Sequence, residues 1–172
     1  MKRFLAVALL VLSVSGCASY TWTSSVPSKM RSVQVPTFRN ESSLTESASL
    51  VTRQVLREFQ REGTFSLMSD GAALEIQGAV TEVSTYGMET NYRIGSRYYG
   101  GMMRIVAMVS VIDKLNGRIL IDNRVYVGEA PFSSGHDSTT ALRDATARAA
   151  DLLAQHVVDD VLKMDFNAKT EK

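Results

Sequence analysis

Apolar and polar residues follow a period of three to four in two parts of the chain, and this period predicts two helices. The first predicted helix lies within residues 39–63, with a Ser43–Glu46 capping box near its start and Gly63 at its end. Its apolar face consists of Leu44, Ala48, Val51, Val55 and Phe59. The second predicted helix begins at Ser138 and runs for about 26 residues.

The remaining patterned stretches show the shorter-range alternation or the continuous apolar runs that are typical of β-strands. Predicted strands cover residues 31–38, 64–69, 72–88, 103–114 and 118–130. Asp70–Gly71 and Asn116–Gly117 predict tight turns, and Gly78 predicts a bulge or a close backbone approach. The order β-α-β-β-β-β-α predicts an α+β two-layer sandwich. Its mixed, mostly antiparallel sheet of four to five strands is expected to carry both helices on one face.

Residues 86–101 interrupt the strand pattern and predict a loop rich in tyrosine, glycine and arginine. Such a loop is either an ordinary hairpin tip or a contact surface, and the sequence leaves both interpretations open. Interleaved aromatic and cationic side chains suit a partner that offers apolar and anionic groups together. The candidate contact residues in this loop and next to it are Tyr92, Arg93, Arg97, Tyr98, Tyr99 and Arg104.

The N-terminus carries the features of an export signal. Lys2 and Arg3 precede an apolar stretch that is too short to span a bilayer, and the stretch ends in Val-Ser-Gly-Cys at Cys17. This ending resembles the lipobox of bacterial lipoproteins, which implies cleavage before Cys17 and acylation of its sulfur and new N-terminus. Ala18, where an Asp would retain the protein in the inner membrane, implies the periplasmic face of the outer membrane. The alternative is an ordinary signal peptide with a chance cysteine.

The expected organisation is a signal peptide over 1–16, a lipidated tether over 17–30, a single α+β domain over 31–166 and a flexible tail over 167–172. The signal removes two of the 19 basic residues and none of the 18 acidic ones, so the mature chain has a formal charge of −1. A near-neutral chain argues against a nucleic-acid partner. Cys17 is the one cysteine, so no disulfide or cysteine metal site is expected.

No catalytic set is found. The two histidines are His136 and His156, and Ser, His and Asp adjoin one another at His136 without a nucleophile elbow. Neither histidine has a second ligand at metal spacing. We therefore expect a protein that is not an enzyme, has no metal, and carries no cofactor besides the covalent lipid on Cys17.

Several segments together resemble the LptE family of lipopolysaccharide-assembly lipoproteins. They are the lipidated cysteine with the aromatic polar stretch after it, VPTFRNES (35–42), the amphipathic helix ending in Gly63, LEIQGAVTEVS (74–84), VSVIDKLNGRIL (109–120) and LLAQHVVDDVL (152–162). The stretch after Cys17 departs from the Gly-Tyr-x-Leu that the family often shows. The resemblance implies a lipoprotein that sits in the lumen of the large outer-membrane β-barrel LptD, helps it to fold, and contacts lipopolysaccharide.

Two other classes stay open. The first strand, the helix and residues 111–130 also resemble the α/β domain of curli-type secretion lipoproteins, which build oligomeric pores. Those proteins insert β-hairpins into the membrane, and residues 86–101 are too polar for a lipid-facing strand. An envelope enzyme is the other class, and it lacks a catalytic set.

Overall fold

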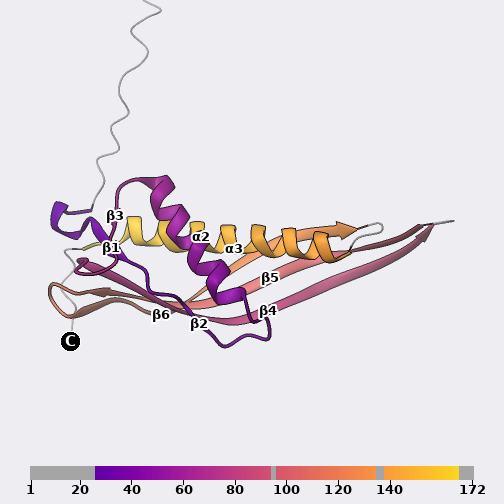
Figure 1. Cartoon of the computed structure of the whole chain (residues 1–172), viewed down its shortest axis with the longest axis horizontal. Coiled ribbons are helices and arrows are strands. Elements are labelled where there is room, and N and C mark those ends of the chain that lie inside the picture. Colours follow the sequence, from indigo (N-terminus) through magenta and orange to yellow (C-terminus); the bar gives the residue numbers. More distant parts are fainter. Residues whose placement is uncertain (1–25, 94–95, 135–137, 167–172) are drawn as a thin grey trace, which may run out of the picture.

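Three long antiparallel strands, β4, β5 and β6, form the greater part of one mixed six-stranded sheet (Figure 1). The computed structural model describes residues 26–93, 96–134 and 138–166. Its strands are β1 (Ser32–Gln34), β2 (Arg39–Asn40), β3 (Ser66–Leu67), β4 (Leu74–Arg93), β5 (Ser96–Asp113) and β6 (Arg118–Ser134), and a 3₁₀ turn, η1 (Ser28–Met30), precedes β1. The sheet order is β3-β1-β4-β5-β6, and the short β2 also pairs with β4. β1 and β2 run parallel to β4, so the sheet is mixed as predicted, with slightly more strands.

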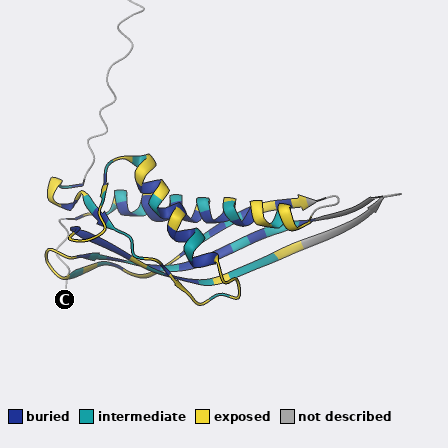
Figure 2. Ribbon diagram, viewed as in Figure 1, coloured by how far each residue is buried: buried dark blue, intermediate teal, exposed yellow. Residues whose placement is uncertain are grey.

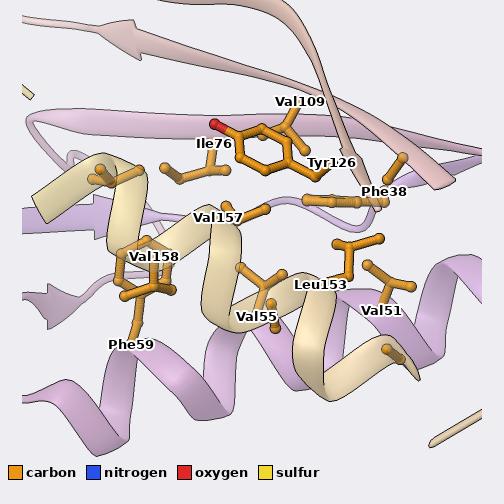
Figure 3. Close-up of a cluster of buried hydrophobic side chains, with 14 of the residues drawn as sticks. Phe38, Val51, Val55, Phe59, Ile76, Val109, Tyr126, Leu153, Val157 and Val158 are labelled. Carbon is orange, nitrogen blue, oxygen red and sulfur yellow. The ribbon is translucent and has the colours of Figure 1, made fainter. Parts of the chain in front are cut away.

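Helices α2 (Ser47–Glu62) and α3 (Ser138–Lys163) form the second layer, on one face of the sheet (Figure 1). α3 packs on β5 and β6, and α2 packs on α3 and on β2, β3 and β4. Figure 3 shows Val55 and Phe59 of α2 beside Val157 and Val158 of α3, with the sheet above them. Buried positions concentrate between the two layers (Figure 2). The α+β two-layer sandwich expected from the sequence is confirmed.

The start of the first helix differs from the prediction. The predicted capping box is wrong: α2 begins at Ser47, its N-cap Glu46 makes no side-chain cap bond, and Leu44 is 41% exposed. The cause is Asn40, whose amide nitrogen donates to the carbonyls of Leu44 and Thr45 and whose oxygen accepts from Ser47. These bonds hold residues 40–47 in a turn that delays the helix. The predicted end is confirmed, because Gly63 has φ +80° and donates its N–H to the Phe59 carbonyl.

The predicted loop over residues 86–101 is wrong. β4 continues to Arg93 and β5 starts at Ser96, so the two strands form a hairpin that extends far past the core. β6 also runs to Ser134 and pairs with β5 as far as Tyr99, where a loop was expected from residue 131. The loop prediction rested on the tyrosine, glycine and arginine content of this stretch. Backbone pairing of β5 with β4 and, as far as Tyr99, with β6 continues the strands through it, and local composition does not show such pairing.

Gly78 and Thr81 set which face of β4 meets the helices. Gly78 allows a close approach, as one of the two expectations had it: a β-carbon there would lie 2.4 Å from the Phe38 ring. The pairing of β4 with β5 shifts register further on, between Val80 and Glu82, where Thr81 is the extra residue, and again between Tyr86 and Glu89. Because of the extra residue at Thr81, the β4 residues that face the core have even numbers up to Val80 and odd numbers from Val83 onward.

α3 comes very close to β6 at Gly128. A β-carbon on Gly128 would lie 1.9 Å from the Ala149 carbonyl oxygen and 2.8 Å from the Leu153 nitrogen. The facing side of α3 includes small buried residues, Ala145, Ala149, Ala150 and Ala154, which let the helix backbone come this near. Only glycine fits at this point of the strand.

Gly128→Ala is expected to lower the free energy of unfolding by about 3 kcal/mol, because the helix must move off the strand to admit the methyl group. Val125→Ile is the matched control: it adds one carbon to the same strand at a position that is 57% exposed. Urea titration followed by circular dichroism measures both. Equal, small losses in the two variants would contradict the close-contact account.

Asp113 organises the turn between β5 and β6. It is fully buried, and its carboxylate accepts hydrogen bonds from Leu115 N, from Asn116 N and Nδ2, and from Arg118 Nη2 at 3.1 Å. Burial by itself raises the pKa of this carboxyl, but the hydrogen bonds from Asn116 and Arg118 outweigh it and hold the pKa below its usual value. Arg118 also donates to the Phe166 carbonyl, so the same group ties down the end of the described chain.

Asp113→Asn is expected to cost about 2–4 kcal/mol at neutral pH, because it leaves the Arg118 charge without its carboxylate. The pKa of the Asp113 carboxyl is lower in the folded protein than in the unfolded chain, where it is about 3.9. The ionised carboxylate therefore stabilises the folded protein at a pH above 3.9, and this contribution disappears as the pH falls through the pKa of the folded state. The stabilities of wild type and variant should therefore converge in strong acid, measured by urea titration from pH 7 to pH 2. A difference that is constant over this range would contradict the assignment.

Candidate functional site

The molecule has two distinct ends. Val26 is 1% exposed and Met30 is buried, so the packed body begins before residue 31, where the domain was expected to start. β1 follows directly and pairs with the first residues of β4, while β4 finishes at Arg93 at the opposite end (Figure 1). Cys17, the expected signal peptide and the first part of the expected tether, residues 17–25, lie outside the described residues, whereas residues 26–30 of the tether are described. The chain therefore enters the described body at the end opposite the hairpin tip.

The hairpin carries five of the six candidate contact residues at its tip. We define the arm as residues 84–93 of β4 and 96–104 of β5. In its register, Tyr92 pairs with Arg97 and Arg93 pairs with Ser96. Tyr98 and Tyr99 follow within the next two pairs. Figure 1 shows the arm continuing beyond the ends of both helices. The side chains of residues 88–99 lie outside the described part, so their role in contact stays a prediction.

Arg104 lies at the base of the arm and apart from the tip. It follows Arg97 by seven positions, which is about 23 Å along a strand. It pairs with Ser84 of β4 and Glu129 of β6, and its guanidinium lies 3.8 Å from the Glu129 carboxylate. Neighbouring Met103 and Ile105 are buried under the helices, so Arg104 faces the uncovered side of the sheet.

Tyr86 joins Arg104 and Glu129 on that uncovered face. Partial burial raises the pKa of the Tyr86 phenol, and a hydrogen bond and the charge of Glu129 raise it further. The phenol therefore stays neutral at physiological pH and acts as a hydrogen-bonding group. Sequence reasoning missed this cluster, because the register that unites residues 86, 104 and 129 depends on three strands.

A groove opens between the two helices at the base of the arm. It encloses about 820 Å³, within the size range of small-molecule sites. Val83 of β4 and Met103 of β5 line it from the sheet, and Leu50 and Leu142 line it from the helices. The turn before α2 closes one side with Ser43, Leu44, Thr45 and Glu46. Sequence reasoning missed the groove too, because no local pattern shows how α2 and α3 meet.

The one described contact of His156 does not place it for catalysis. His156 of α3 is exposed, and its Nδ1 lies 3.0 Å from the Val127 carbonyl oxygen of β6. His136 lies outside the described residues. Among the residues that are described, no three His, Cys, Asp or Glu side chains gather as metal ligands would, and no helix has the length and apolar character needed to cross a bilayer.

A family comparison identifies the class of this protein. A family profile described as "LptE: Lipopolysaccharide-assembly" matches residues 30–161, which is most of the chain. The match defines an assembly protein of the lipopolysaccharide pathway, a class that is not enzymatic. The chain belongs to the LptE family.

Solved structures of low sequence identity were compared with this chain. A Xanthomonas campestris protein of the DUF330 family is 13% identical, with a TM-score of 0.50 over 77% of this chain and 86% of that chain. A minor lipoprotein from Acinetobacter baumannii is 12% identical, with a TM-score of 0.46 over 77% and 93%. The PelC dodecamer from Paraburkholderia phytofirmans is 15% identical, with a TM-score of 0.42 over 76% and 88%. The first shows a shared fold, and the two weaker likenesses carry no argument. No curated protein matches the chain.

Proposed function

We propose that this protein is anchored by acyl chains on Cys17 to the periplasmic face of the outer membrane, where it plugs a large β-barrel of the LptD type. In this role it assists the transport and insertion of lipopolysaccharide. Membership in the LptE family supports the assembly role. Two or three acyl chains would hold the protein stably at the membrane, whereas one chain would not.

The observation that carries the proposal is that the chain entry and the arm lie at opposite ends of the molecule. The chain enters the body at one end, and the arm projects from the other with Tyr92, Arg93, Arg97, Tyr98 and Tyr99 near its tip (Figure 1). β4 has twenty residues, about 66 Å of extended strand, whereas an ordinary strand has five or six. A membrane-tethered protein with such an arm can reach deep into a lumen while its anchor stays in the bilayer.

The residue types at the tip suit lipopolysaccharide. Arginine binds phosphate through two parallel N–H donors, and tyrosine covers apolar surface while its hydroxyl contacts sugars or water. Arg93 pairs with Ser96, and Arg97 belongs to the next pair, with Tyr92. Successive pairs alternate between the two faces of a hairpin, so each face of the tip has an arginine position and neither is the uncharged face that a lipid-facing strand needs. This pattern favours a plug inside a barrel over the membrane-inserted hairpin of a curli-type pore.

Pull-down of the tagged, lipidated protein from its native outer membrane should recover one large β-barrel in a one-to-one ratio, measured by mass spectrometry. A Cys17→Ala variant should leave the outer membrane and lose most of the barrel. Rings of this chain alone would instead favour the curli-type oligomer, and recovery without any barrel would contradict the proposal.

The double variant Arg93→Ala, Arg97→Ala should bind purified lipopolysaccharide about tenfold more weakly, because two charge-assisted contacts to phosphate are lost. The matched control is Arg39→Ala, Arg57→Ala, which removes the same charge from exposed sites away from the arm. Binding is measured by microscale thermophoresis at fixed salt. If both variants bound lipopolysaccharide equally weakly, the arginines of the tip would act only through overall charge, and a specific phosphate contact at the tip would be contradicted.

A further inference from the structure

We propose that the interhelical groove is a second lipid site, in which acyl chains of lipid A lie between α2 and α3 while Arg53 and Arg143 bind its phosphates. This inference rests on the proposed function for the identity of the lipid. It adds a binding site that is separate from the arm tip.

The lining of the groove suits an acyl chain. Leu50, Val83 and Leu142 are each half-buried, so a ligand that covers them removes apolar surface from water. Met103 adds a flexible thioether side chain that adapts to ligand shape. Leu44, which would have packed on the core if α2 began earlier, is instead 41% exposed at the groove wall. The turn built on Asn40 therefore supplies one apolar wall of the site.

The charges at the groove favour an anionic occupant. Arg53 of α2 and Arg143 of α3 both line it and are both exposed. Within the described part of the chain, neither arginine forms an ion pair. Glu46 is the one acidic residue of the lining, so the lining has a net positive charge. Two guanidinium groups that form no ion pair with the described residues, beside an apolar groove, match a molecule that joins phosphate to fatty acyl chains.

The groove and the arm tip are too far apart to be one pocket. Val83 lies in the groove and Arg93 lies ten residues further along β4, about 33 Å away in an extended strand. The two sites therefore engage different parts of one large ligand, or two ligands in succession. Because Val83 and Met103 belong to β4 and β5, a lipid in the groove also contacts the two strands that continue as the arm.

Photo-crosslinking in cells tests the groove in the full-length, lipidated protein. p-Benzoylphenylalanine replaces Leu142 or Leu44, and after irradiation the purified protein is probed with antibody against lipopolysaccharide. Matched control positions are Ile119 and Val125, which are apolar and more than half exposed on the uncovered face of the sheet. We expect lipopolysaccharide adducts at least about fivefold more abundant from the groove positions than from the controls, since crosslinking follows local occupancy.

Charge reversal tests the phosphate contact. Arg53→Glu, Arg143→Glu should lower the Leu142 adduct about tenfold, whereas Arg39→Glu, Arg57→Glu should leave it unchanged, because only the first pair lines the groove. Equal adducts at groove and control positions, or a protein adduct in place of lipid at Leu142, would overturn the inference. Recovery of the β-barrel in the same purification tests the proposed function independently of the groove. If the barrel is recovered but the groove positions give no lipopolysaccharide adduct above the controls, the groove inference is rejected and the proposed function is not.

Discussion

The close contact of α3 with Gly128 is the constraint on which the remaining structure depends. Without a β-carbon at this point, the α3 backbone rests directly on β6. Tyr126 donates to Asp160 at 2.6 Å, and Arg124 pairs with the same carboxylate. Burial raises the pKa of Asp160, but its bonds to Tyr126 and Arg124 outweigh this and keep the pKa low, so the carboxylate stays charged at neutral pH. α2 then packs on the helix that these contacts position, and the groove follows from the arrangement of both helices.

The same docking protects one edge of the sheet. β6 is the last strand on its side, and such a strand is open to pairing with another chain. Arg148 donates to the Pro131 carbonyl at 2.7 Å, and His156 contacts the Val127 carbonyl, so α3 occupies two carbonyl groups of this strand. Pro131 itself has no N–H to offer. The histidine that sequence reasoning weighed as a possible ligand thus contacts the backbone of an edge strand.

Local signals in the sequence were sufficient to predict the two layers of the fold but not the arm or the groove. The period of Val51, Val55 and Phe59 predicted the helix face. Gly71 and Gly117 predicted the two tight turns, and both glycines have positive φ. The arm was mistaken for a loop because its strands are stabilised by each other and by β6, which local composition does not show. The start of α2 was misplaced because a side-chain turn at Asn40 competes with the capping box. The groove joins residues more than ninety positions apart, and only tertiary packing brings them together.

The central claim is that the arm enters the lumen of a barrel while the opposite end stays with the membrane anchor. Single-particle cryo-electron microscopy of the complex purified from native membranes tests this claim most directly. The account predicts one copy of this chain per barrel, with the Tyr92–Arg97 tip inside the lumen and the β1 and η1 end facing the periplasmic leaflet. An arm that points away from the barrel, or a ring of this chain without a barrel, would contradict it.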